Sequence, residues 1–413
     1  MARTGAAPRN VVFISRQRLV GATNGSSAYL LDLAKAVRDA GFVPHLVQPS
    51  PTVAGRWPVL SLRPEMDVFA SHRIRGLVRI GRRFVTPAPH VYAAIARSLV
   101  ASAGRRLGFS GAWTEDRKLP YAVAIPWTAA DHRWLAQAAR GKADIAIADY
   151  MFCAEGIASL PDPAVPSAIV MHDLFHARKG GGADSVALVT REQEVTMLSR
   201  ADAVVAIQPA EAAFVAEHVP ATRAIVAPMA ATPVAAPQPG EHDRLLFVGS
   251  NTAPNVVGLQ WFFDAVWPAI RAACPQATLD VAGTVGRAFD SAPEGVRLLG
   301  LVDDLDPLYT RAGVVISPLT FGSGLKIKLI EALARGKAIV ATTITVEGAE
   351  RETEDAVHVT DDAARFADHV VALNRDPAAR AALAQAALTA ARDHYSAQSC
   401  YAAFVEWLRS AAR

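Results

Sequence analysis

Two glycines and two lysines stand close together in the C-terminal half of the chain. Gly322 and Gly324 are followed by Lys326 and Lys328, where an apolar pattern with helical spacing begins at Leu325. Free backbone N–H groups at a helix start attract an anion, and glycines let a phosphate approach closely. Because the helix dipole disfavours a lysine there by up to about 1 kcal/mol, two lysines predict a bound anion, and a nucleoside diphosphate fits.

A carboxylate lies one helical turn beyond these lysines. Glu331 follows Lys328 by three residues, so the two side chains share a helix face. In this position Glu331 is placed to accept hydrogen bonds from the hydroxyls of a ribose next to the diphosphate. A second interpretation stays open, in which Glu331 only forms surface ion pairs with Lys328 and Arg335.

The elements that must position these residues alternate along the chain. Short β-branched runs are separated by stretches with helical spacing, and this order implies parallel strands with helices on both faces of a sheet. The 413 residues exceed what one core usually serves. We therefore predict an α/β fold with two doubly wound, Rossmann-like domains facing across a cleft that holds the site. Strands are expected at 10–14, 43–47, 144–148, 167–171, 203–207, 223–227, 245–248, 278–281, 296–299, 314–317 and 338–341.

The boundary between the two domains is predicted in a segment without periodicity. Residues 230–240 are rich in Ala, Pro and Gly, which is typical of a linker. The predicted domains are residues 1–235 and residues 236–396. A last amphipathic helix occupies residues 397–413.

Composition narrows the class of protein. The formal net charge is +3 and 20% of the residues are charged, so nothing indicates a nucleic-acid partner. The N-terminus lacks the features of a signal peptide, and no apolar run approaches the roughly 18 residues of a membrane span. Cys153, Cys274 and Cys400 lie far apart without a CxxC pair, so no cysteine metal site is expected. A cytoplasmic location is predicted.

Two other classes of α/β protein are disfavoured. A dehydrogenase would need a third glycine after Gly283 and Gly286 and an acidic residue further on, and both are missing. A periplasmic sugar receptor would need an export signal.

The pattern GxGxKxKxxEAxxxG, from Gly322 to Gly336, resembles the donor-site signature of glycosyltransferase family 4. Phe247-Val248-Gly249 resembles the first strand and loop of that family's C-terminal domain, and Gly300 to Leu305 resembles its nucleobase loop. The resemblance covers residues 245–355 closely and the N-terminal half more faintly. It implies a retaining glycosyltransferase of the GT-B type, whose last helix packs back on the first domain.

What the resemblance implies extends to partners and residues. The second domain would bind a nucleoside-diphosphate sugar, and the first a hydroxyl-bearing acceptor such as a glycan, a glycolipid or a metabolite, as in polysaccharide biosynthesis. Catalytic roles are implied for His172, Asp173, Lys326 and Glu331. The donor would be bound by Gly249, Ser250, Asn251, Gly300, Val302, Gly322, Ser323, Gly324, Leu325, Lys328 and Glu331.

The first domain carries two further positions that resemble the family. His172 follows an expected strand, and the resemblance implies that it projects toward the transferred sugar, while Asp173 orients the imidazole or binds the acceptor. Asn24 and Gly25 lie in a polar loop before a helix and resemble the family's N-terminal glycine loop, which closes over phosphate or acceptor. A structural histidine and an ordinary capped helix remain the alternatives.

The sequence departs from the family pattern at the donor site. Ser323 stands where many relatives have a glutamate that contacts the donor sugar, and Ser250 and Asn251 replace cationic residues that hold the diphosphate. We expect Lys326 and Lys328 to supply this charge, so that no metal is needed. The departures keep an alternative open, namely a non-catalytic protein or an epimerase or hydrolase that processes nucleotide sugars.

A basic segment, residues 72–106, interleaves arginines with apolar residues. One interpretation is peripheral contact with an anionic membrane, at its inner face, which would bring a lipid-linked acceptor to the cleft. The others are an acceptor site for phosphates or carboxylates, and ordinary solvated surfaces. The arginines are Arg73, Arg75, Arg79, Arg82, Arg83, Arg97, Arg105 and Arg106.

Overall fold

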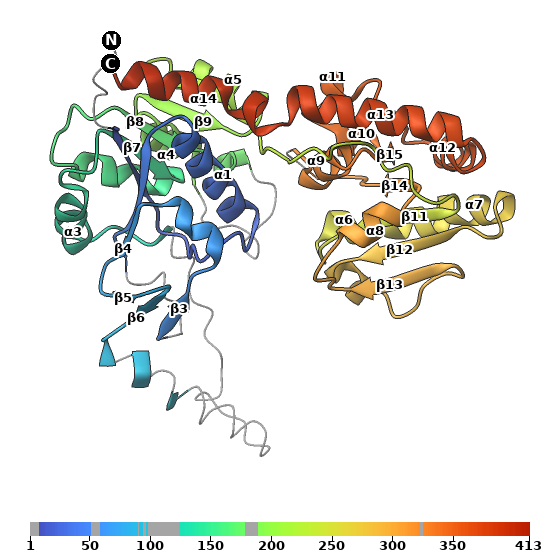
Figure 1. Cartoon of the computed structure of the whole chain (residues 1–413), viewed down its shortest axis with the longest axis horizontal. Coiled ribbons are helices and arrows are strands. Elements are labelled where there is room, and N and C mark those ends of the chain that lie inside the picture. Colours follow the sequence, from blue (N-terminus) through green and yellow to red (C-terminus); the bar gives the residue numbers. More distant parts are fainter. Residues whose placement is uncertain are drawn as a thin grey trace, which may run out of the picture. The chain divides into compact units, whose positions relative to one another are not determined.

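A computed structural model describes residues 8–50, 58–89, 91–93, 96–97, 124–177, 189–322 and 325–413. It divides into two compact units (Figure 1). The first unit runs to Ala227 and also takes in Tyr401–Arg413, and the second is Pro228–Cys400.

The first unit is built on a parallel sheet of seven strands in the order β10-β9-β8-β7-β1-β2-β4. Its interior strand β1 (Asn10–Ile14) is buried on both faces, as expected for an all-parallel sheet whose faces are covered by helices. The other strands are β2 (Val43–Gln48), β4 (Ser71–Ile74), β7 (Ile145–Asp149), β8 (Ser167–Val170), β9 (Ala203–Ala206) and β10 (Arg223–Val226). The helices are α1 (Gly25–Asp39), η2 (Pro64–Val68), α3 (Ala129–Ala139), η5 (Met151–Ser159), η6 (Phe175–Ala177), α4 (Arg191–Leu198) and α5 (Pro209–His218).

A small antiparallel sheet adjoins the β4 edge of this sheet (Figure 1). Its strands are β3 (Val59–Ser61), β5 (Val78–Ile80) and β6 (Arg83–Val85), in the order β3-β6-β5. Phe84 is buried and its ring packs at 4.7 Å from that of His72 on β4. Strands of three residues are too short to show a period, so the sequence pattern does not predict this small sheet.

The second unit has a parallel sheet of six strands in the order β13-β12-β11-β14-β15-β16. The strands are β11 (Arg244–Val248), β12 (Thr278–Ala282), β13 (Val296–Gly300), β14 (Val314–Ser317), β15 (Ala338–Ala341) and β16 (His358–Val359). The helices are α6 (Ala253–Trp261), η7 (Phe262–Val266), α7 (Trp267–Ala273), η8 (Thr284–Ala288), α8 (Asp306–Arg311), α9 (Ile327–Ala334), α10 (Thr343–Val346), α11 (Glu350–Thr353), α12 (Ala363–Arg375) and α13 (Pro377–His394). The predicted α/β class with two doubly wound sheets is confirmed.

One predicted helix is interrupted by a turn of π-helix. The sequence predicts a continuous helix to Ala273, whereas α6 and α7 are separated by η7, and the Trp267 N–H reaches back to the Phe262 carbonyl. Pro268 follows directly and has no N–H to continue the ladder, so the helix widens at this point.

The predicted linker is bound along the second unit. The Arg392 side chain donates hydrogen bonds to the carbonyls of Val234 (3.0 Å) and Ala235 (2.7 Å), and Arg380 donates to that of Pro239 (3.2 Å). A Cβ on Gly240 would lie 1.9 Å from a carbonyl oxygen of the loop after α8, so the backbone approaches too closely for any other residue. The second unit therefore begins at Pro228, whereas the domain expected from the sequence begins at residue 236.

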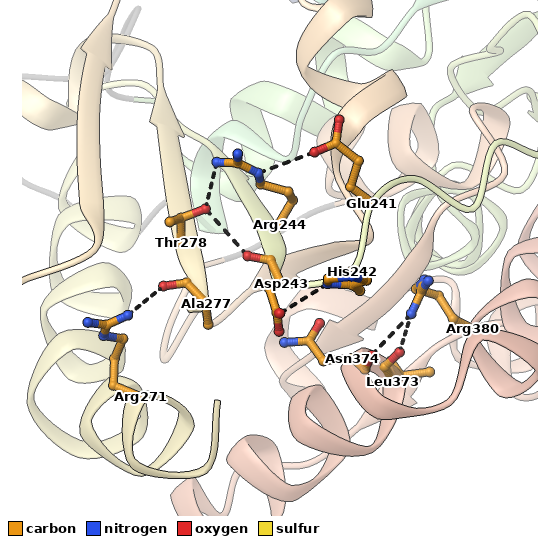
Figure 2. Close-up of polar contacts among 10 residues, drawn as sticks. All are labelled: Glu241, His242, Asp243, Arg244, Arg271, Ala277, Thr278, Leu373, Asn374 and Arg380. Atoms are coloured by element: carbon orange, nitrogen blue, oxygen red, sulfur yellow. Dashed lines mark hydrogen bonds and ion pairs between the residues drawn. The ribbon is translucent and has the colours of Figure 1, made fainter. Parts of the chain in front are cut away.

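Figure 2 shows how the chain continues from this segment into the sheet of the second unit. Arg244 donates to the Thr278 hydroxyl (3.1 Å), and the Thr278 N–H donates to the Asp243 carbonyl (2.8 Å), which joins the start of β11 to β12. Arg380 also donates to the Leu373 carbonyl at 2.7 Å, at the end of α12. These contacts bind both ends of the segment to regular elements.

The last helix, α14 (Ala397–Ala411), contains the second point where the chain passes between units. From Tyr401 onward it belongs to the first unit, where the Tyr401 ring lies 6.5 Å from that of Tyr29 on α1. Over the described residues, no helix has both the length and the apolar character needed to cross a bilayer.

Candidate functional site

The expected anion site lies between β14 and α9 in the second unit. α9 begins at Ile327, so Lys326 is its N-cap residue and Lys328 lies in the first turn, which has no acidic residue. Gly322 adopts a φ of +137°, a conformation that favours glycine. Ser323 and Gly324 lie outside the described residues, and half-buried Leu325 leads into the helix.

Both lysine side chains are partly withdrawn from water. Lys328 Nζ donates a hydrogen bond to the Val248 carbonyl at 2.7 Å, at the end of β11, and burial lowers the pKa of Lys328 to about 8 despite the nearby Glu331. Burial also lowers the pKa of Lys326, whose Nζ lies 3.5 Å from the Glu347 carboxylate. Two ammonium groups thus stand near the carboxyl ends of adjacent strands, where α/β sheets bind their ligands.

The loop that follows β11 is held by close backbone contacts. A Cβ on Gly283, which has a φ of +100°, would lie 2.2 Å from the Gly249 carbonyl oxygen, and a Cβ on Gly249 would lie 2.5 Å from the Phe247 ring, so both positions favour glycine. The Asn251 N–H donates to the Thr284 hydroxyl at 2.8 Å, and the Asn255 amide donates to the Ser250 carbonyl at 3.0 Å. The loop that carries Gly249, Ser250 and Asn251 therefore has a defined conformation.

Glu331 does not form the surface ion pairs with Lys328 and Arg335 that were the alternative interpretation of its position. Arg335 instead pairs with Asp306 at 2.8 Å and stacks over the Tyr309 ring at 4.5 Å. Within the described ranges Glu331 has no ion pair, so its half-buried carboxylate is available to a ligand. Gly300 (φ +68°) is the last residue of β13, and half-buried Val302 lies in the loop that follows, where the base was expected.

The lowered pKa of Lys328 gives nucleotide binding a pH dependence. A diphosphate favours the charged ammonium, so the affinity for a nucleoside diphosphate is expected to be highest below about pH 8 and to fall above it, by at most tenfold per pH unit. The measurement is titration calorimetry at intervals from pH 7 to 9. The same series on Lys328→Met removes any contribution from ionisation of the nucleotide. A parallel fall in both proteins would contradict the assignment.

In the first unit, His172 follows β8 and is almost fully buried. Its Nε2 lies 2.8 Å from Oδ1 of Asp149, the last residue of β7, which has no exposed surface. The other carboxylate oxygen accepts hydrogen bonds from Ser15 Oγ (2.6 Å) and Gln17 Nε2 (2.7 Å). Because a carboxylate only accepts, His172 Nε2 carries the hydrogen, and Nδ1 of the neutral ring is then an acceptor.

The residue that accepts the Nε2 hydrogen of His172 is therefore Asp149. The two roles predicted for Asp173, orienting the imidazole or binding the acceptor, stay predictions. Asp173 Oδ1 accepts the N–H of Leu174 at 2.8 Å and so caps the next turn of the chain. Asp149 was missed because its partner comes from another strand. A signal was present, since an acidic residue ends the buried run 145–148 beside the polar residues that follow β1.

The Tyr150 ring packs against the imidazole of His172. Its ring lies 4.0 Å from the His172 ring, and the Tyr29 ring meets His172 edge-on at 5.8 Å. Tyr150 has a φ of 67° and a ψ of 150°, a backbone conformation that is strained for any residue other than glycine. Such strain commonly occurs where the position of a side chain matters for function.

The strain at Tyr150 predicts an unusual order of stabilities. Tyr150→Gly is expected to be more stable than Tyr150→Ala by about 1 kcal/mol, because both lose the ring but only glycine is relaxed at this φ and ψ. Urea unfolding of the two variants measures the difference. At an ordinary position alanine is the more stable residue, so that order here would refute the strain.

The loop with Asn24 and Gly25 is an N-capped helix start that also contacts the hydrogen bonds around Asp149. Asn24 Oδ1 accepts the Ser27 N–H at 2.8 Å and the Ser27 hydroxyl accepts the Asn24 N–H at 3.0 Å, while Gly25 is the first residue of α1. Ser26 Oγ donates to the Gln17 side chain at 3.2 Å. Asn24 thus acts as a helix cap, and the loop adjoins the group that holds His172.

The basic segment is partly paired within the protein. Arg75 forms an ion pair with Asp131 at 2.7 Å, and Arg82 pairs with Asp67. Arg105 and Arg106 lie outside the described residues. Within the described part of the chain, no three His, Cys, Asp or Glu side chains are grouped so that they could hold a metal ion.

Comparison with known proteins connects this geometry to a family. Residues 242–376, from the start of β11 to the end of α12, match the family described as glycosyl transferases group 1. An uncharacterised 44.6 kDa protein in the cps region of Klebsiella pneumoniae is 22% identical over 172 residues, 38% of this chain and 44% of that protein. A phosphatidyl-myo-inositol mannosyltransferase of Propionibacterium freudenreichii subsp. shermanii is 32% identical over 158 residues, 36% of this chain and 40% of that protein. The chain therefore matches less than half the length of these curated relatives.

The fold is shared with a solved structure over nearly the whole chain. HepE of Anabaena, in complex with UDP, superposes with a TM-score of 0.60 at 14% identity, covering 97% of this chain and 100% of that one. The expected fold of two Rossmann-like domains of the GT-B type is thereby confirmed. Within this fold, residues 242–376 of the second unit are similar to the glycosyl transferases group 1 family.

Proposed function

We propose that this protein is a glycosyltransferase that moves a sugar from a nucleoside diphosphate to a hydroxyl-bearing acceptor. The observation that carries the proposal is the pair of partly buried ammonium groups, Lys326 and Lys328, at the start of α9, inside the segment that matches the glycosyltransferase family. The UDP complex of the structurally similar HepE supports a nucleotide-sugar donor. The resemblance to family 4 supports retention of configuration at the transferred sugar.

The proposed reaction depends on stabilising the leaving group. The bond from the anomeric carbon to the diphosphate oxygen breaks, and negative charge gathers on the diphosphate, which Lys326, Lys328 and the first N–H groups of α9 would stabilise without a metal. The acceptor hydroxyl then forms its bond on the same face of the sugar and passes its proton to the departing phosphate. Glu331 would bind the ribose hydroxyls.

His172 would act on the transferred sugar through Nδ1. Asp149 fixes the hydrogen on Nε2, so Nδ1 would accept a hydrogen bond from a sugar hydroxyl. Gly249, Ser250, Asn251, Gly300 and Val302 are proposed to contact the nucleotide. A glycan or glycolipid acceptor is proposed because of the relatives from a cps region and from phosphatidylinositol mannosylation. Cytoplasmic location and peripheral membrane contact belong to the same proposal.

The test of this function is transfer from a panel of UDP- and GDP-sugars. Thermal shift with the free nucleotides selects the donor, and product analysis with and without acceptors shows whether the sugar is transferred. Lys326→Ala and Glu331→Ala are each expected to abolish transfer while the protein stays folded. Glu217→Ala, a change at a mostly exposed carboxylate of α5, is the matched control.

Two results would overturn the proposal. Unchanged turnover in both Lys326→Ala and Glu331→Ala would place the donor elsewhere. Release of free or epimerised sugar without transfer to any acceptor would instead favour the nucleotide-sugar-processing alternative, which the serine at position 323 keeps open.

A further inference from the structure

A chain of buried polar side chains links five neighbouring strands of the first unit. Starting from His172 and Asp149, it passes through Gln17, whose Nε2 donates to Asp149. Gln48 Nε2 donates to the Gln17 carbonyl at 2.6 Å, and Gln48 Oε1 accepts from His72 Nε2 at 2.8 Å. His172 follows β8, Asp149 ends β7 and Gln17 follows β1, while Gln48 lies on β2 and His72 on β4. The hydrogen-bonded side chains therefore extend from His172 to the edge strand of the sheet.

At the β4 end of this chain the surface is hollowed. The hollow measures about 430 Å³ and lies between β4, the small antiparallel sheet and α3. His72 lines it together with Arg73, Arg79, Leu77, Phe84 and Trp134. The Arg73 guanidinium lies 5.6 Å from the centre of the Trp134 ring, and that of Arg79 lies 5.9 Å from the centre of the Phe84 ring.

The hollow has two positive charges and no negative one. Arg75 and Arg82 have carboxylate partners, but among the described residues neither Arg73 nor Arg79 has one. His72 adds no charge, because burial, with the nearby Arg79, lowers its pKa to about 3. Exposed guanidinium groups on aromatic rings are well suited to bind an oxyanion, and the rings themselves offer flat apolar surface.

The position of the hollow determines what can occupy it. From β8, which precedes His172, to β4 there are four strand spacings of about 4.8 Å, so the hollow lies roughly 19 Å from the histidine. A hexose phosphate is too short to place its anion in the hollow while a hydroxyl is near His172. An extended molecule can do both.

We propose that this hollow is an acceptor subsite for a phosphate or carboxylate group on an extended acceptor, roughly 19 Å from the accepting hydroxyl. Arg73 and Arg79 bind the oxyanion, and Trp134 and Phe84 contact the body that bears it. The inference rests on the proposed transfer reaction and names its acceptor class. The anion has two sources, a lipid-borne phosphate or an acidic oligosaccharide, which share this chemistry.

The test uses the full chain and compares two doubly substituted proteins. Arg73→Gln/Arg79→Gln removes the hollow's cations, and Arg83→Gln/Arg223→Gln removes two exposed arginines outside it. Binding is measured by sedimentation with vesicles of phosphatidylcholine containing a fifth phosphatidylglycerol, and by titration with a tetragalacturonate, with maltotetraose as the neutral probe. Circular dichroism checks folding, and Arg73→Lys/Arg79→Lys keeps the charge if the glutamine protein unfolds.

The expected result is that one anionic probe binds the wild type and is weakened at least tenfold only in Arg73→Gln/Arg79→Gln. Vesicle binding would identify the lipid source, and tetragalacturonate binding the soluble one. The subsite would be overturned if Arg73→Gln/Arg79→Gln and Arg83→Gln/Arg223→Gln lost the same amount of anion binding. It would also be overturned if the wild type bound the anionic probes no more tightly than maltotetraose. Binding of UDP and of GDP is measured in parallel, and the absence of both in the wild type would count against the transferase proposal, whereas the anion result judges the hollow by itself.

Discussion

Lys328→Met is expected to weaken UDP binding by at least tenfold and to lower kcat/KM by a factor of about 10²–10³. The ammonium group is partly buried at the end of β11, so its charge is poorly screened and acts strongly on a nearby diphosphate. The effect on kcat/KM is larger than that on binding because the charge on the leaving group grows in the transition state.

The stability of Lys328→Met is expected to change much less, by about 1 kcal/mol or less. The variant loses the hydrogen bond to the Val248 carbonyl but no longer buries an ammonium group, and these effects oppose each other. Calorimetric titration with UDP and urea unfolding measure both quantities. Lys35→Met, on the exposed side of α1, is the control and should leave both unchanged. Full UDP affinity in Lys328→Met would remove the lysine from the site.

Asp149→Asn is expected to lower kcat by about 10²–10⁴ while UDP affinity stays within twofold. The carboxylate accepts three hydrogen bonds, from His172, Ser15 and Gln17, in a position with no exposed surface. Asparagine offers one acceptor oxygen and an NH₂ group that faces donors, so the imidazole loses either its partner or its tautomer. The unpaired donors are expected to lower the free energy of unfolding by about 1–3 kcal/mol.

The control for Asp149→Asn is Asp173→Asn, the residue first expected to orient the histidine. Initial rates with saturating donor, measured from pH 5 to 9, separate the two variants. Asp149→Asn should also alter the pH dependence of kcat, because a neutral amide replaces the carboxylate that accepts the hydrogen bond from Nε2. If Asp173→Asn lost more activity and changed the pH profile, Asp149 would have no positioning role.

The sequence by itself determined the fold class and the grouping of two lysines at the start of one helix. Strands of an all-parallel sheet are buried on both faces, so they appear as short apolar runs that any reader of the chain can find, as at residues 10–14 and 145–148. The start of α9 is equally local. Glycine, lysine and the free N–H groups of a helix start act within a few residues of one another, so the sequence alone reveals that Lys326 and Lys328 lie together.

Only the tertiary structure decided which side chains meet across strands. His172 takes Asp149 as its partner rather than the adjacent Asp173, and Lys328 finds the carbonyl of a residue 80 positions away. Arg380 and Arg392 bind the predicted linker from a helix, 141 and 157 positions away. The hollow beside the small antiparallel sheet likewise brings together residues from separate elements. Such contacts depend on the order of strands in a sheet and on which helices cover it, and a local pattern of residue types does not contain that order.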